Sequence, residues 1–200
     1  LDPEEPRHRL TRAQILGPLG RFAEASQEAE RAAAGSERRP HVKARALCLL
    51  GDIAASGPQP DYKRAVGYHT EAIKLADTLT SSPHPAVRLP AKEVLVDAHL
   101  GAAQDIAWGA WNQKEASVSK WLQRAATAAD DLIATERGSS EYRFRVAARG
   151  LTAYVGLQGK LDPTELADEA VRVGQEMVGA ATTSAVKQQI QWDLGMALYD

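Results

Sequence analysis

Two segments in the first half of the chain carry the same pattern of side chains at helical spacing. In each, an aromatic residue is followed by small or packing residues at +3, +7 and +10: Phe22, Ala25, Ala29 and Ala32 in the first copy, and Tyr62, Ala65, His69 and Ala72 in the second. Positions at this spacing share one face of an α-helix. Because the same face occurs twice, the sequence predicts an array of repeated helical units.

Glycine and proline divide the rest of the chain into further helices. Proline lacks the amide hydrogen that a helix interior needs, and glycine commonly ends a helix. Breaks of this kind predict four consecutive helix pairs at residues 7–35, 40–80, 85–137 and 141–180, followed by a lone helix at residues 183–200. Pro90 leaves two interpretations for the first helix of the third pair: a start near Pro85, or a start or kink near Leu89. No alternation of apolar and polar residues indicates a strand.

The composition favours closely packed helices and argues against several kinds of partner. Hydrophobic residues make up 44% of the chain, to which alanine contributes much, whereas aromatic residues make up only 6%. A net charge of −2 favours neither nucleic acid nor an anionic membrane as a partner, and no apolar run approaches the ~20 residues of a membrane span. Cys48 is the only cysteine, which excludes an internal disulfide and a cysteine-based zinc site.

Leu-Gly pairs accompany the repeated face. Three of these pairs lie at residues 19–20, just before the first aromatic, at residues 50–51, before the second, and at residues 194–195 near the C-terminus. In these features the chain resembles the tetratricopeptide repeat (TPR) family, in which two antiparallel helices form each repeat. The resemblance implies an all-α fold, a right-handed α-solenoid of about four antiparallel helix pairs plus a C-terminal helix, built as a single domain over residues 1–200.

The resemblance covers the chain unevenly. It is good over residues 7–78, weak between residues 85 and 180, and returns at residues 188–199. Phe22 and Tyr62 are 40 residues apart, whereas the TPR period is about 34, and the loop at residues 57–60 accounts for part of the excess. We expect the middle pairs to be degenerate TPRs or another kind of α-solenoid repeat, and the chain to be a fragment of a longer protein.

The resemblance also implies a concave groove, lined by the first helix of each pair, that binds a partner peptide or helix. The positions that would face this groove are Leu10, Gln14, Arg45, Cys48, Asp52, Trp192 and Met196. One TPR subtype grips a C-terminal carboxylate with lysine and asparagine side chains, but the corresponding positions here hold leucine, glutamine, cysteine and aspartate. We therefore expect a protein–protein interaction scaffold without a carboxylate clamp.

Three tryptophans lie around the turn that follows the expected helix at residues 85–110. Trp108, Trp111 and Trp121 could form an aromatic anchor for a partner, because tryptophan is enriched in binding hot spots. The alternative is core packing between two long helices, which the scarcity of other large residues in this region favours.

No arrangement of residues indicates catalysis or a bound cofactor. None of the histidines lies four residues from another, and His69 occupies a packing position of the repeat. Glu93 and Asp97 share a helix face and could supply two oxygens to a metal, but paired carboxylates on a solvated helix are far commoner. The glycines at residues 156–160 lack the strand and the Ser or Thr of a phosphate loop. We expect no enzyme activity, no metal and no cofactor.

Two alternatives to a peptide-binding scaffold stay open. The lone last helix and the weakly matching middle pairs could dock on a second copy and form a homodimer, or the chain could be a regulatory arm of a multidomain enzyme or signalling protein. The amino-acid composition of the chain, rich in alanine and arginine and poor in asparagine, is typical of a bacterium with a GC-rich genome. The chain begins with Leu1 and carries no basic-then-apolar leader, so we expect a processed or truncated N-terminus and favour a cytoplasmic location.

Overall fold

The prediction of an all-α fold is confirmed. The computed structural model describes residues 5–112, 114–136, 140–181 and 183–199, and these contain helices and no strand. In chain order the helices are α1 (Pro6–Leu16), α2 (Phe22–Ala34), α3 (Pro40–Ser56), α4 (Tyr62–Asp77), α5 (Pro85–Trp108), α6 (Lys114–Glu136), α7 (Glu141–Gly156), α8 (Thr164–Ala180) and α9 (Ser184–Tyr199). Of the described helices, none is long and apolar enough to cross a membrane.

Local signals in the sequence account for the helix starts. The Asp61 carboxylate accepts a hydrogen bond from the Arg64 backbone N–H at 2.9 Å and caps α4. Helix α5 begins at Pro85 and continues through Pro90, so the first interpretation of this helix is correct. Helix α8 begins at Thr164, and Asp162 accepts a hydrogen bond from the Thr164 backbone N–H at 3.0 Å.

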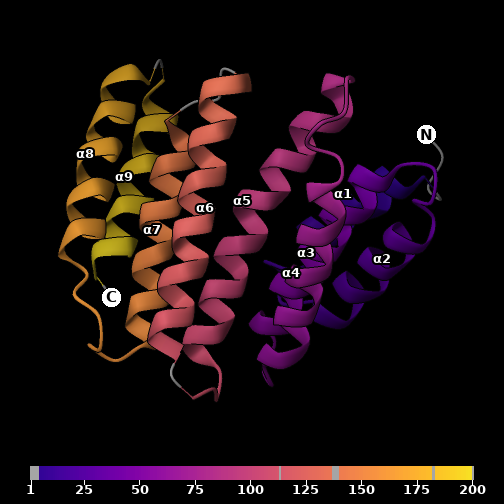
Figure 1. Cartoon of the computed structure of the whole chain (residues 1–200), viewed down its shortest axis with the longest axis horizontal. Helices are drawn as coiled ribbons and strands as arrows, with labels where there is room; N and C mark the ends of the chain where they lie inside the picture. The colour runs from indigo at the N-terminus through magenta and orange to yellow at the C-terminus, as the bar shows by residue number, and fades with distance from the viewer. Residues whose placement is uncertain (1–4, 113, 137–139, 182, 200) are drawn as a thin grey trace.

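The helices form two layers (Figure 1). Each helix packs against the next one along the chain, and α1, α3, α5, α7 and α9 also pack against one another in succession. We call this row of odd-numbered helices the inner layer. In the described parts of the chain, the even-numbered helices do not pack against one another. The odd-numbered helices therefore form a row in which each contacts the next, from α1 to α9. The right-handed superhelical twist expected of the solenoid stays a prediction.

The repeated face seen in the sequence is the buried face of α2 and α4. Its small residues are fully buried in both helices: Ala25, Ala29 and Ala32 in α2, and Ala65 and Ala72 in α4. One apolar core joins α1 to α5 and a second joins α5 to α7, so α5 belongs to both. Consistent with this position, α5 is buried around most of its circumference.

The ring of His69 fits between α3 and α5 because each helix has a glycine at the point of contact. His69 is fully buried, as expected for a packing position. A Cβ atom added to Gly51 would lie 2.5 Å from the imidazole ring, and one added to Gly101 would lie 2.4 Å from it. The glycine of the Leu50-Gly51 pair therefore provides the space that the histidine of the next helix fills.

Candidate functional site

Four of the predicted groove residues line one hollow of the inner layer. This hollow of about 270 Å³ is bordered by Gln14 on α1 and by Arg45, Cys48 and Asp52 on α3. Helices α5 and α7 complete it, and its lining residues from these helices are Asp97, Arg145 and Arg149. We call it the Arg45 hollow. The fold thus brings together residues that are far apart in the sequence.

The remaining predicted groove residues lie elsewhere. The role of Leu10 in binding a partner stays a prediction, and this residue does not line the Arg45 hollow: it is only 9% exposed and packs with Ala32, Val42 and Ala46. The reason is the register of α1, which turns this side chain toward α2 and α3. Trp192 is 67% exposed on α9. The backbone of Met196 belongs to α9, but its side chain lies outside the described part of the structure.

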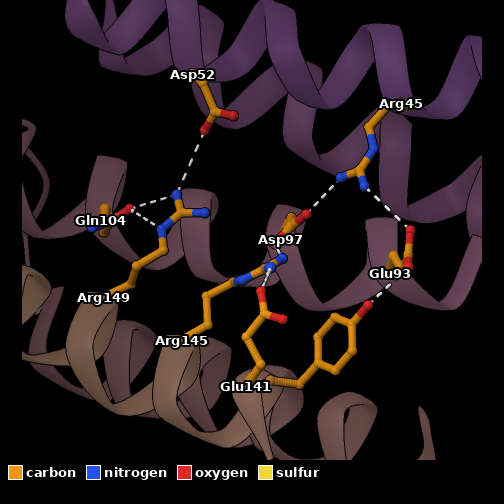
Figure 2. Close-up of polar contacts among 9 residues, drawn as sticks. Arg45, Asp52, Glu93, Asp97, Gln104, Glu141, Arg145 and Arg149 are labelled. Atoms are coloured by element: carbon orange, nitrogen blue, oxygen red, sulfur yellow. Dashed lines mark hydrogen bonds and ion pairs between the residues drawn. The ribbon is translucent and has the colours of Figure 1, made fainter. Parts of the chain in front are cut away.

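An ionic network joins α3, α5 and α7 across the inner layer (Figure 2). Arg45 donates from Nη1 to Oδ2 of Asp97 at 2.5 Å, and Arg145 donates from Nη1 to Oδ1 of the same carboxylate at 2.9 Å. Glu93 accepts from Arg45 at 3.3 Å and from the Tyr142 hydroxyl at 2.8 Å. Both carboxylates are thus bound by side chains of neighbouring helices, and the described residues contain no group of three or more His, Cys, Asp or Glu side chains that could hold a metal ion.

Asp97 is the centre of this network and is 8% exposed. Burial alone would raise the pKa of its carboxyl, but the guanidinium groups of Arg45 and Arg145 outweigh burial and hold this pKa below its ordinary value. Asp97 is therefore ionised at neutral pH and connects two arginines from helices on either side of its own.

Arg149 on α7 is held in one orientation by two partners. Its Nε and Nη2 donate to Oε1 of Gln104 at 3.0 and 2.7 Å, and Nη2 lies 3.5 Å from Oδ1 of Asp52. The third nitrogen, Nη1, has no hydrogen-bond partner among the described residues, and Figure 2 shows it pointing away from Asp52 and Gln104. Arg149 is thus a fixed cation with donor capacity left for a ligand.

Three further hollows adjoin the Arg45 hollow along the inner layer, and each shares Asp52 or Arg149 with it as a lining residue. A hollow of about 430 Å³, which we call the Asp105 hollow, shares both residues with the Arg45 hollow. A hollow of about 440 Å³ toward the α1–α2 turn shares Gln14 and Asp52 with it. A largely apolar hollow of about 510 Å³ between α7, α8 and α9 shares Arg145 and Arg149, and its apolar lining comes from Phe144, Met177, Val186 and Ile190. The run extends from α1 to α9.

Asp105 is a buried acid that borders this run of hollows. It is 3% exposed, and its Oδ2 lies 3.3 Å from Nε2 of His69. Burial, together with the nearby Asp52, raises the pKa of Asp105 to about 8, and burial lowers the pKa of His69 to about 4. Both groups are therefore neutral at pH 7. Asp105 Oδ2 and the two ring nitrogens of His69 have no hydrogen-bond partner among the described residues.

The three tryptophans have different neighbours. Trp108 is 48% exposed and lines the Asp105 hollow. Trp111 lies over Gly109, where an added Cβ would collide with its ring. Trp121 packs on His99 with ring centroids 5.4 Å apart. Of the three, Trp108 is the one placed on the inner layer beside the groove residues.

Arg145, Arg149 and Asp105 are the site residues that sequence reasoning missed. Arg145 and Arg149 lie one helical turn apart on α7, the first helix of the fourth pair, as Arg45 and Asp52 lie on α3, the first helix of the second pair. Alignment of this helix with the first helices of the earlier pairs would have identified them. Residues 141–157, however, contain no Leu-Gly pair on which to base such an alignment. Asp105 carries no local signal of its role.

Neither a protein-family model nor a curated protein sequence matches this chain.

Proposed function

We propose that the chain is a protein–protein interaction scaffold whose inner layer binds an extended segment of a partner protein. The observation that carries this proposal is the run of adjoining hollows, joined at the Asp52–Arg149 pair. The TPR resemblance supports the same conclusion, because it implies a groove on the first helix of each pair.

The chemistry of the run suits a peptide backbone with mixed side chains. An extended peptide presents a carbonyl oxygen at every residue, and Arg149 has an unused donor at the junction of three hollows. Arginine is also enriched among residues that dominate binding energy. The flanking ion pairs hold the side chains in place before binding, so little ordering entropy is lost from the receptor.

Replacement of Arg149 by glutamine is expected to weaken peptide binding by roughly 10- to 100-fold, the value of one charge-assisted hydrogen bond. Peptides would be selected from a displayed library on the intact chain, and their affinities measured by fluorescence anisotropy. The matched control is Arg172→Gln on α8, where the arginine is half-exposed and paired with Glu169 and Glu176. This control is expected to leave affinity unchanged.

Two results would contradict the proposal. One is a library selection that enriches no peptide for the folded chain. The other is a set of peptides that bind the Arg149→Gln and Arg172→Gln variants equally well, because their site would then lie away from the junction of the hollows.

Self-association through α9 is the second candidate function. This helix exposes three large apolar side chains, Val186, Trp192 and Leu198. A single exposed apolar residue is ordinary, but several on one element are typical of an interaction surface. We expect the mass from light scattering to rise toward that of a dimer with concentration, and Trp192→Glu to keep the chain monomeric. A wild-type chain that stays monomeric over the whole series refutes this function.

A further inference from the structure

Asp105 and His69 form a buried polar pair that is not satisfied by the protein. The two side chains are 3.3 Å apart, yet Asp105 Oδ2 and both ring nitrogens lack a hydrogen-bond partner in the described structure. A buried polar group without a partner lowers stability, and such groups in native proteins call for an explanation. The glycines at positions 51 and 101 make room for the histidine ring, so the site depends on several residues of α3, α4 and α5.

The hollow beside this pair has acidic and aromatic walls. Asp105 borders it from α5 and Asp52 from α3, and the half-exposed indole of Trp108 lies on its rim with Tyr62. Arg149 also lines it, but Nε and Nη2 of its guanidinium are bound to Gln104 and Asp52, which leaves Nη1 as its one unused donor among the described residues. An anion would therefore meet two carboxyl groups, whereas a cation would gain a carboxylate and an aromatic face.

The size and ligand set of the hollow decide which cation it suits. The described residues contain no group of three His, Cys, Asp or Glu side chains that could hold a metal ion. A hollow of about 430 Å³ has room for a long aliphatic side chain, and an ammonium group carries three hydrogen-bond donors for an acceptor such as the Asp105 carboxylate.

We propose that the Asp105 hollow binds the ammonium group of a lysine side chain, which the partner segment on the inner layer supplies. This inference rests on the proposed function, since the lysine belongs to the bound segment. The aliphatic part of the side chain lies against Trp108, and the ammonium group reaches the Asp105 carboxyl group at the wall of the hollow.

The protonation of Asp105 makes this binding pH-dependent. The ionisable groups that act on Asp105 are His69 from α4, Asp52 from α3 and Arg149 from α7. With its pKa raised to about 8, Asp105 is protonated at pH 7 and must lose this proton to pair with an ammonium ion. A lysine side chain stays charged up to a pH of about 10. Affinity therefore increases with pH, by up to about tenfold per unit below pH 8, and then levels off.

The test uses the intact chain and a small probe, Nα-acetyl-lysine N-methylamide. Backbone amide shifts of Gly101 and Gln104 are followed by NMR at several pH values between 6 and 9. We expect saturable shifts with millimolar affinity that tightens with pH. The matched probe with norleucine in place of lysine, which has the same carbon chain without the ammonium group, is expected to give none.

Asp105→Asn is expected to abolish both the lysine shifts and their pH dependence, while a thermal melt shows that the variant is folded. Should this variant not fold, Trp108→Leu serves instead and is expected to weaken lysine binding at least about threefold. Equal shifts from the norleucine probe, or no saturable shift with lysine, overturn the inference. Either result leaves the proposed function standing if selected peptides still depend on Arg149, so the two failures are distinguishable.

Discussion

Replacement of Gly101 by alanine is expected to lower the free energy of unfolding by about 3 kcal/mol, the upper part of the range for overpacking in a core. The new Cβ would lie 2.4 Å from the imidazole ring of His69. The ring cannot move away, because Gly51 on the opposite helix approaches it just as closely. Relief therefore requires α3 or α5 to shift, which disturbs the two cores that α5 joins.

The measurement is urea denaturation of the variant and of a matched control, Gly67→Ala on α4. Gly67 is exposed and has no atom within 4 Å of an added Cβ, so this control is expected to gain roughly 0.5 to 1 kcal/mol from helix propensity. The double variant Gly101→Ala with His69→Ala is expected to be more stable than the sum of the single effects, because the clash is gone. Additive effects would show that the ring is not what limits position 101.

Replacement of Asp97 by alanine is expected to lower the free energy of unfolding by about 2 to 3 kcal/mol at pH 7. The substitution removes the carboxylate that pairs with Arg45 and Arg145, and leaves both partly buried arginines without this partner. The control is Asp130→Ala, which removes an exposed ion pair with Arg143 and is expected to cost less than about 1 kcal/mol. Similar losses for the two variants would refute a special role for the Asp97 network.

The same variant has an expected pH dependence. The pKa of Asp97 in the folded protein lies below that in the unfolded chain, which is about 3.9. Its contribution is therefore fully present above this pH and is lost as the pH falls through the lower, folded value. Denaturation curves of wild type and Asp97→Ala should accordingly converge as the pH is lowered below about 4.

The helices were predictable because their signals are local. Pro40 and Pro85 stand at the first positions of α3 and α5, and Asp61 caps α4 through a neighbour three residues away. The buried faces of α2 and α4 were predictable for the same reason, since residues at +3 and +7 share a face in any helix.

Part of the candidate site followed from the repeat register and part did not. Gln14, Arg45, Cys48 and Asp52 were identified from their positions on the first helices, and they line one hollow. Leu10, identified in the same way, packs under the surface and does not line this hollow. It could not be assigned at all for α7, where two further arginines contribute to the same hollow.

The sequence by itself determined where the helices lie and which of their faces are apolar. Both depend on the backbone hydrogen bonds of a single helix, which fix the spacing of side chains on its surface. Only the tertiary structure decided that Arg45, 52 residues from Asp97, and Arg145, 48 residues from it, meet at one carboxylate. Such meetings depend on how far each helix slides and rotates against its neighbours, and this is set by the packing of many side chains at once.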